Sequence, residues 1–460
     1  MINAEQIKNE LKVSYINSDG LVGFKTFKIP ESEQFEWIHA NKEYDPIVRS
    51  WDNKKVRKKA TTILNSYRIA EFLMTIPQKD QDEIFANNTP KKYYCDIETE
   101  ILDVFPDANN PKSAIQTIAI TNDNDLVMVL GTIDISKETQ NKIQAKLNEY
   151  FIDFNKNITF KYMYFPTEYD MLYSFFHRAI KNMPFITGWN FVDFDWAYLV
   201  GRASFLNIDV SVSSPSGKMS KDGLPLHKLI IDYMEVYRKW DTIIQMKDFN
   251  SLDFVASSAL NVKKIKYNGS LTDLYKNDYE GFVYYNAVDS YLVKLIDEKL
   301  NTLVPFFVLG HLTACEQNRV FSPVHMVENI MIQQLWKDKK RVFVRSFEKS
   351  EKTEKYAGAY VKDPIVGFHN YLATFDYSSE YPTNIRQWNI SPDVFIRKDK
   401  NAVVTDDIIV TSSGAIFKKH EDGVLRILLT DLFNNRKKAK KIAGDVSSEI
   451  DYLETILKNK

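Results

Sequence analysis

The chain has 460 residues, 44% of them hydrophobic and 26% charged, which is the composition of an ordinary globular protein with room for about three domains. Lys and Arg number 60 against 61 Asp and Glu, and this balance neither requires nor excludes a nucleic-acid partner, because only local charge steers one. Two cysteines exclude a disulfide framework and a zinc-finger spacing. We expect neither a secretion signal nor a membrane span, since no apolar run approaches about 18 residues.

Residues 91–99, which read Lys-Lys-Tyr-Tyr-Cys-Asp-Ile-Glu-Thr, organise the rest of the chain. We expect a strand here, and side chains on a strand alternate between faces, so Asp96 and Glu98 point the same way, about 7 Å apart. Neighbouring buried carboxylates repel each other, and a divalent cation removes that repulsion, because hard ions such as Mg²⁺ prefer oxygen ligands. An isolated Asp-x-Glu is more often a solvated strand end, so the metal interpretation depends on acids farther along the chain.

Strand and helix patterns surround this stretch. Residues before 91 are rich in strand patterns, and four later segments have clear periodicity: strands over 114–121 and 126–130, and helices over 138–150 and 168–182. Residues 185–199 predict a short buried strand, a turn and a helix whose first turn carries Asp195, with Asn190 or Asp193 as its cap.

A second acid-bearing helix follows a strand predicted over 228–233. The helix spans 282–296 and buries a stripe of Val and Leu side chains. Tyr285 and Asp289 are four residues apart on it, so both face the same point in space.

The C-terminal third carries a further acid and a long helix. The apolar run 371–375 predicts a strand that delivers Asp376, and Tyr381-Pro382 begins a helix, because proline suits the first helical turn. From residue 425 the chain reads as helix, with a possible break at Gly444. An apolar stripe along this helix calls for a partner helix, and its members are Ile442, Val446, Ile450, Leu453 and Leu457.

Asp96 with Glu98, Asp195 and Asp289 stand in three separate apolar settings. Two metal ions about 3.5–4 Å apart activate a water and stabilise a leaving oxygen in phosphodiester cleavage. Such a pair needs about four carboxylates from different elements, since one strand or helix cannot surround two ions. Tyr285 is placed to hold the attacking water through its hydroxyl.

These residues carry a family resemblance. Asp96-Ile97-Glu98, Gly188-Trp189-Asn190 with Phe194-Asp195, and Tyr285-x-x-x-Asp289 resemble the three exonuclease motifs of family B DNA polymerases. Residues 375–392 resemble the polymerase motif A of the same family. The motif A region, together with residues 356–365, is most similar to the replicative polymerases of T-even-type tailed phages.

The resemblance implies that the chain is the N-terminal part of a family B polymerase. Its fold would be multidomain, of α/β and α+β class. Residues 91–302 would form a 3′→5′ proofreading exonuclease domain with an RNase H-like fold and a mixed sheet. A β-rich N-terminal domain would comprise residues 1–90, with 303–347 returning to it. Residues 348–422 would form a partial palm, and 423–460 the first fingers helix.

In the implied exonuclease site, Asp96, Glu98 and Asp289 would hold one Mg²⁺ and Asp96 with Asp195 a second, with Mn²⁺ as a substitute, and Tyr285 would orient the water.

In the implied polymerase site, Asp376 would be one of two carboxylates that bind the catalytic metal ions. Ser379 and Tyr381 would line the nucleotide site, with the tyrosine ring excluding a ribose 2′-hydroxyl. Arg436 and Lys440 would grip the triphosphate of a dNTP, although a solvated basic face is the alternative for these two residues.

The sequence departs from the family pattern in two ways. Glu380 stands where the family usually has leucine, and a carboxylate there would repel a triphosphate. No segment matches the later fingers motif or the Asp-Thr-Asp palm motif that supplies the second catalytic carboxylate. We therefore expect DNA synthesis to need a second polypeptide with the rest of fingers, palm and thumb; a truncated or decayed polymerase is the alternative.

The expected activity is thus Mg²⁺-dependent 3′→5′ exonuclease action on primer-template DNA, with a polymerase role when joined to the partner. A sliding clamp would be met through that partner, and the setting would be the cytoplasm of a phage-infected bacterium. One alternative is a nucleic-acid-binding or regulatory module, for primer-template or mRNA, with incidental nuclease activity. A free-standing repair nuclease is disfavoured, because it would need neither motif A nor a fingers helix.

Overall fold

The structure is a computed structural model that describes residues 1–40, 48–100, 107–108, 110–241, 250–267, 269–338, 341–344 and 360–458. It packs as two compact units: unit 1 comprises residues 1–31 and 75–329, and unit 2 comprises residues 32–74 and 330–460. None of the helices in the described part of the chain is long and apolar enough to cross a membrane.

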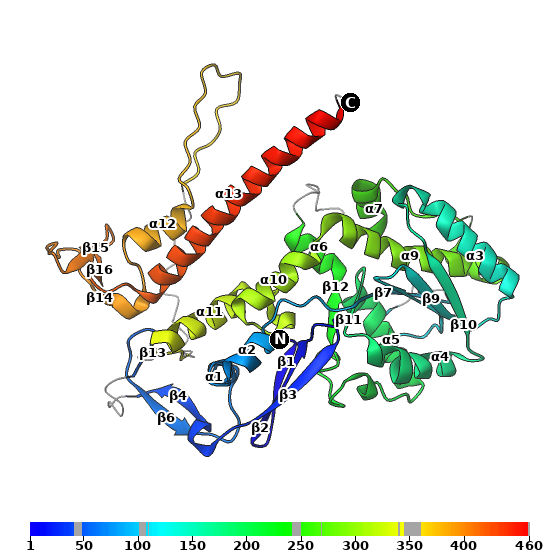
Figure 1. Ribbon diagram of the computed structural model, residues 1–460, viewed down its shortest axis with the longest axis horizontal. Helices are drawn as coiled ribbons and strands as arrows, with labels where there is room; N and C mark the ends of the chain where they lie inside the picture. Colours follow the sequence, from blue (N-terminus) through cyan, green and yellow to red (C-terminus); the bar gives the residue numbers. More distant parts are fainter. Residues whose placement is uncertain are drawn as a thin grey trace. The chain divides into compact units, whose positions relative to one another are not determined.

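The centre of unit 1 is a six-stranded sheet with the order β10-β9-β8-β7-β11-β12 (Figure 1). Strand β8 runs antiparallel to both β7 and β9, and the other three pairs are parallel. This arrangement confirms the predicted mixed sheet. The strands are β7 (Lys92–Thr99), β8 (Ile115–Asn122), β9 (Leu126–Gly131), β10 (Thr159–Tyr164), β11 (Phe185–Gly188) and β12 (Leu229–Asp232).

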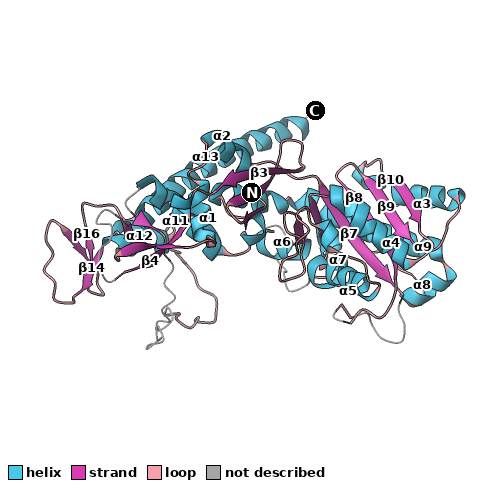
Figure 2. Ribbon diagram, turned by 90° about the horizontal axis from the view of Figure 1, so that it is seen from below, coloured by secondary structure: helices cyan, strands magenta, loops and turns pink. Residues whose placement is uncertain are grey.

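Helices cover both faces of this sheet, because its central strands are apolar on both sides (Figure 2). Tyr94 of β7 belongs to the core cluster that contains α9 (Tyr279–Leu300) and α3 (Lys137–Tyr150). Cys95 and Ile97 point to the opposite face, whose cluster contains α4 (Glu168–Ser174) and α5 (Ala197–Phe205). Strand alternation therefore directs Asp96 and Glu98 to the face that α9 covers.

The remaining elements of unit 1 surround this core. An antiparallel sheet of the order β1-β2-β3 confirms the β-rich N-terminus. Its strands are β1 (Asn3–Ile7), β2 (Glu10–Ile16) and β3 (Val22–Lys28). The other helices are α2 (Gln78–Ile84), α6 (Tyr233–Trp240), α7 (Leu252–Leu260), α8 (Leu271–Asn277) and α10 (Leu303–Thr313). Helix α11 (Pro323–Asp338) follows α10 in the chain.

The described residues of unit 2 form three small sheets and three further α-helices. Strands β4 and β6 pair antiparallel, β5 and β13 pair parallel, and β14-β16-β15 form an antiparallel sheet. Their bounds are β4 (Phe35–His39), β5 (Arg49–Ser50), β6 (Val56–Ala60), β13 (Arg341–Val342), β14 (Phe395–Lys398), β15 (Ile408–Val410) and β16 (Ala415–Lys418). The helices are α1 (Ser66–Leu73), α12 (Glu380–Gln387) and α13 (Val424–Lys458).

The predicted strand over 371–375 is wrong. Residues 360–377 contain no strand and are exposed throughout, with Phe368 and Tyr371 fully open to solvent. An apolar run forms a stable strand only when a neighbouring strand pairs with it. No described segment pairs with this one.

Two other expectations differ in detail. Helix α13 is continuous through Gly444, because a single exposed glycine costs a helix only about 1 kcal/mol. The first 90 residues do not pack as one body: β1–β3 lie in unit 1, whereas β4–β6 lie in unit 2. These two compact units do not correspond to the predicted domains, whose boundaries stay a prediction. The motif segment 356–359 lies outside the described residues.

Candidate active site

Three carboxylates meet between β7 and α9. Asp96 and Glu98 come from β7 and Asp289 from α9, and one oxygen of each lies within 4.8 Å of the others. Helix α9 is held against the sheet by its buried apolar stripe, so its one carboxylate in this turn is pressed against those of the strand. Asp289 is 3% exposed, while Asp96 and Glu98 are partly exposed. The structure thus gathers three of the four predicted exonuclease acids.

Asp195 lies beside this cluster rather than in it. It belongs to a single π-helical turn, Phe191–Trp196, that connects β11 to α5. Its Oδ1 accepts a hydrogen bond of 3.0 Å from the backbone N–H of Ile97, the residue between Asp96 and Glu98. The fourth predicted acid is therefore tied directly to the strand that carries the first two.

The turn that delivers Asp195 is not capped as expected. Asn190 adopts left-handed backbone (φ 58°) and its side chain makes no capping hydrogen bond. Instead Asp232, at the end of β12, accepts from Val192 N at 3.4 Å with one oxygen and caps α6 through Met234 N at 2.8 Å with the other. A distant strand end therefore anchors this turn.

Crowding and burial raise the pKa values of all four acids. Burial, and then the charge of Asp289, raises the pKa of Asp96 to about 7. Burial and Asp96 hold the pKa of Glu98 well above its usual value, and the same two causes act on the pKa of Asp195. Burial also raises the pKa of Asp289, although Lys264 opposes it. Like charges that cannot all ionise in such a space create a site for a cation.

Lys264 joins the helix side of the cluster. Its Nζ lies 2.5 Å from Asp289 Oδ2 and donates to the Tyr285 hydroxyl at 2.6 Å. Burial disfavours this ammonium, but Asp289 and Tyr285 outweigh burial and leave the pKa of Lys264 above its usual value. Burial and Asp289 likewise raise the pKa of Tyr285, so its hydroxyl keeps its proton at neutral pH. The Tyr267 ring packs edge-on against Tyr285 at 5.4 Å.

The donor set fits a hard divalent cation. Within the described part of the chain, Asp289 Oδ1 is buried and has no hydrogen-bond partner. A buried carboxylate oxygen without a partner is costly, and a metal ion would satisfy it. Asn286 donates to Asp96 Oδ2 at 2.7 Å and holds that carboxylate from the opposite side.

Sequence reasoning missed three of these side chains. The sequence does carry a signal for Asn286, because this residue lies three positions before Asp289 on the same helix and so shares its face. Lys264 had none, since it stands in the basic run Lys263-Lys264-Ile265-Lys266, which reads as a solvated loop. Asp232 was visible as a strand end, but its link to Val192 depends on strand pairing between β11 and β12.

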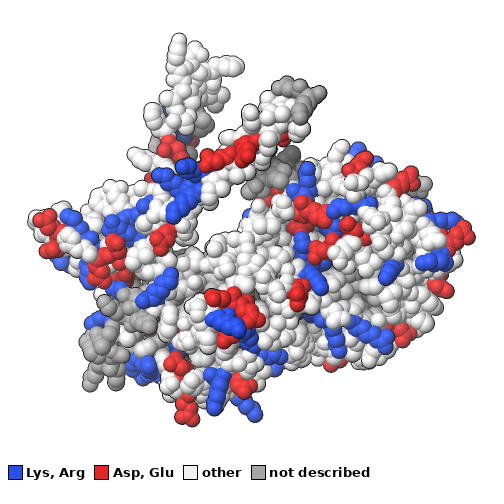
Figure 3. Space-filling view, in the orientation of Figure 1, with Lys and Arg blue, Asp and Glu red and all other residues white. Residues whose placement is uncertain are grey.

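The predicted polymerase residues lie in unit 2 and are not gathered into a buried site. Asp376 and Tyr381 are exposed, and Ser379 is half-buried in left-handed backbone (φ 52°) just before α12. Arg436 and Lys440 are exposed on α13. Figure 3 shows a block of Lys and Arg on this helix, followed by Asp and Glu farther along.

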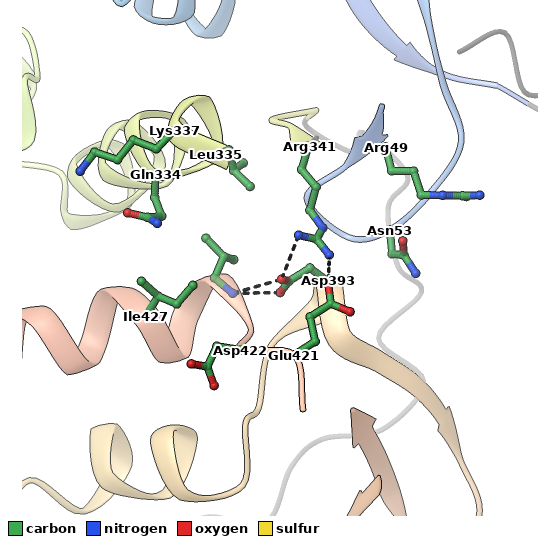
Figure 4. Close-up of a pocket in the computed structure, with 11 residues that line it drawn as sticks. Arg49, Asn53, Gln334, Leu335, Lys337, Arg341, Asp393, Glu421, Asp422 and Ile427 are labelled. Carbon is green, nitrogen blue, oxygen red and sulfur yellow. Dashed lines mark hydrogen bonds and ion pairs between the residues drawn. The ribbon is translucent and has the colours of Figure 1, made fainter. Parts of the chain in front are cut away.

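Unit 2 also holds a cavity of about 600 Å³ beside the start of α13 (Figure 4). Arg341 pairs there with Glu421 at 2.6 Å and lies 3.9 Å from Asp393. Asp393 in turn accepts from the backbone N–H of Val424 at 3.1 Å. None of the described lining residues is a predicted site residue. The ion pairs join the chain segments of this unit.

Comparisons with known proteins agree with the motifs. Residues 34–271, more than half of the chain, match the family model for the exonuclease domain of DNA polymerase family B, and residues 316–458 match the model for DNA polymerase family B. The DNA-directed DNA polymerase of Escherichia phage RB69 is 29% identical over 378 residues, which cover 75% of this chain and 41% of the relative.

Other relatives are more distant. The DNA-directed DNA polymerase of Enterobacteria phage T4 is 26% identical over 63% of this chain and 34% of its own length. The DNA polymerase delta catalytic subunit of Caenorhabditis elegans is 25% identical over 60% of this chain and 27% of its own length. The chain spans less than half the length of these relatives. It belongs to the family B DNA polymerases and contains the exonuclease domain of that family.

Proposed function

We propose that this protein removes nucleotides from the 3′ end of DNA, with two Mg²⁺ ions held by Asp96, Glu98, Asp195 and Asp289. The observation that carries the proposal is the meeting of three carboxylates within 4.8 Å, one of which keeps a buried oxygen without a described partner. The match of residues 34–271 to a family B exonuclease domain supports the same activity.

The position of each acid decides which metal ion it would hold. Asp96, Glu98 and Asp289 would hold one ion, and Asp96 with Asp195 the other. When bound, such ions supply a water of lowered pKa and stabilise charge on the leaving oxygen. Asp195 is fixed to the Ile97 amide, so the site keeps a constant spacing between its two halves. Mn²⁺ would substitute, since it accepts the same oxygen ligands.

Tyr285 would orient the attacking water through its hydroxyl, which keeps its proton. Lys264 donates to that hydroxyl and pairs with Asp289, so it directs the remaining O–H away from itself and toward the acids. We propose that Lys264 also neutralises Asp289 before the ions bind, which limits repulsion within the cluster.

We further propose that the chain is the N-terminal part of a replicative polymerase of T-even-type phages. Asp376 would bind catalytic metal ions, Ser379 and Tyr381 would contact the incoming nucleotide, and Arg436 and Lys440 would contact its triphosphate. The match of residues 316–458 to family B polymerase supports these roles. The domain limits are part of the same proposal: 1–90 with 303–347 for the N-terminal domain, 91–302 for the exonuclease, 348–422 for the partial palm and 423–460 for the first fingers helix.

DNA synthesis would require a second polypeptide. Two apolar surfaces of unit 2 support this proposal: the exposed segment 360–377, and the stripe Ile442–Leu457 on α13, whose side chains are 49–72% exposed. Monomeric proteins rarely leave apolar surfaces of this kind open to water. A polypeptide with further palm strands and a second fingers helix would cover both, and would also contact a sliding clamp. The infected host cytoplasm is the corresponding setting.

A single gel tests the proposal. The purified chain is incubated with a 5′-labelled primer-template, Mg²⁺ and dNTPs, beside the Asp289→Ala variant. We expect a descending ladder that disappears in the variant. Absence of degradation by the wild-type chain would refute the exonuclease function. Primer extension would refute the requirement for a second polypeptide.

A further inference from the structure

Asn286 is a polar side chain in contact with Asp96. It is 0% exposed in the middle of α9, and its Nδ2 donates to Asp96 Oδ2 at 2.7 Å. This orientation fits an ionised Asp96, because an amide oxygen in the same place would face a carboxylate oxygen with no proton between them. Burying an amide is costly unless it hydrogen-bonds, and this contact offsets part of that cost, since Asn286 Oδ1 is buried with no hydrogen-bond partner among the described residues.

Three of the four predicted acids each contact a different anchoring group. Asp195 accepts from the Ile97 backbone amide, and Asp289 pairs with Lys264. Among the described residues, Asn286 is the side chain that donates a hydrogen bond to Asp96. Under the proposed function Asp96 is also the acid that serves both ions, so its orientation matters to each of them.

Resting on the proposed nuclease function, we propose that Asn286 is a positioning residue that fixes the Asp96 carboxylate for metal binding. One oxygen is retained by the amide, and the carboxylate plane is thereby set relative to Glu98 and Asp289. Rotation of a carboxylate about its last bond is otherwise loosely restricted. Hydrogen bonds of this kind to metal-binding carboxylates typically change metal affinity or activity about 10–100-fold.

The competing explanation is that the hydrogen bond only ties α9 to the sheet. The same helix offers a matched control for this. Ser290 is also 0% exposed and hydrogen-bonds to Thr121 of β8 at 2.8 Å. Removal of either contact weakens the attachment of the helix, but only Asn286 touches an acid of the cluster.

The test measures Mn²⁺ binding to the full chain by electron paramagnetic resonance of the free ion. Asn286→Leu keeps the side-chain volume and removes the donor, and Asn286→Ala serves if the leucine variant does not fold. We expect Mn²⁺ to bind at least about 10-fold more weakly to the Asn286 variant than to wild type. Ser290→Ala should bind Mn²⁺ as wild type does, with a comparable loss of thermal stability.

Equal Mn²⁺ affinity in wild type and the Asn286 variant would overturn the proposal, as would an equal loss in Ser290→Ala. A wild-type chain that binds no Mn²⁺ would overturn it together with the proposed function. A wild-type chain that binds Mn²⁺ but degrades no DNA would refute the nuclease alone, because the binding comparison stands without activity. As a second readout, the Mg²⁺ concentration for half-maximal cleavage should rise about 10-fold in the Asn286 variant.

Discussion

At the scale of single residues, the site consists of negatively charged carboxylates that are oriented by hydrogen-bond donors and by one ion pair. All four acids have raised pKa values, and three of them have a described partner: Asn286 for Asp96, the Ile97 amide for Asp195 and Lys264 for Asp289. Without metal the cluster is short of positive charge. Removal of an acid should therefore raise the stability of the metal-free protein and lower its exonuclease activity.

Lys264→Met tests the role of the ammonium that pairs with Asp289. Without the ammonium, the Tyr285 hydroxyl loses its donor and Asp289 loses its partner. We expect exonuclease activity on a 5′-labelled single strand to fall about 10–100-fold. Lys266→Met, at an exposed position two residues on, is the control and should retain activity. Equal activity of both variants would show that Lys264 takes no part.

Asp96→Asn tests the charge balance through pH. The pKa of Asp96 is about 7 when folded against an ordinary value of 3.8, so the folded protein binds this proton more tightly than the unfolded chain. Its contribution to stability is complete below about pH 4 and is lost as the pH rises through 7.

The neutral amide avoids that loss. In EDTA at pH 8 we expect Asp96→Asn to be more stable than wild type by about 1–3 kcal/mol, as measured by urea denaturation. Added Mg²⁺ should stabilise wild type but not the variant. A variant less stable than wild type at pH 8 in EDTA would contradict this account of the cluster.

At the scale of elements, the site depends on how closely β11 approaches β7. Gly188 allows it, because a Cβ there would lie 2.2 Å from the Cys95 carbonyl oxygen and 2.9 Å from the Phe191 ring. The carbonyl belongs to the strand that carries Asp96, so a side chain at 188 would push on the site itself.

Gly188→Ala should therefore lower the free energy of unfolding by about 1–3 kcal/mol and reduce exonuclease activity. Gly444→Ala is the control: a Cβ there meets open space on α13, and we expect a gain of about 1 kcal/mol or less with unchanged activity. Chemical denaturation and the cleavage assay measure both effects. A Gly188→Ala variant with wild-type stability and activity would contradict this account, because it would mean that β11 and β7 can move apart at little cost.

Elements with local periodicity were predictable from the sequence, and elements that need a distant partner were not. Strands β8 and β9 and helices α3 and α9 appear where the pattern predicts them. The strand before Asp376 does not form: a strand needs a second segment to pair with, which local periodicity cannot reveal, and no described segment pairs with residues 371–375. Lys264 could not be predicted because its role comes from the fold bringing a loop to α9, which leaves no trace in local spacing.

At the scale of the whole molecule, one segment stands out as unprotected. Residues 360–377 are exposed along their whole length and rich in aromatic side chains, whereas the sheet of unit 1 is buried on both faces. We expect brief chymotrypsin treatment to cut first within 360–377, as identified by mass spectrometry of the fragments. First cuts within β7 or α9 would contradict this order of protection.

The most direct test of the central claim is a single-turnover rate on a 5′-labelled single strand in Mg²⁺. Asp96, Glu98, Asp195 and Asp289 are each replaced by Ala, and Glu138→Ala, at an exposed ion pair on α3, is the control. The account predicts that each of the four variants loses at least about 10²-fold in rate, while the control cleaves as wild type does. Wild-type rates in any one of the four would contradict a site built from all of them.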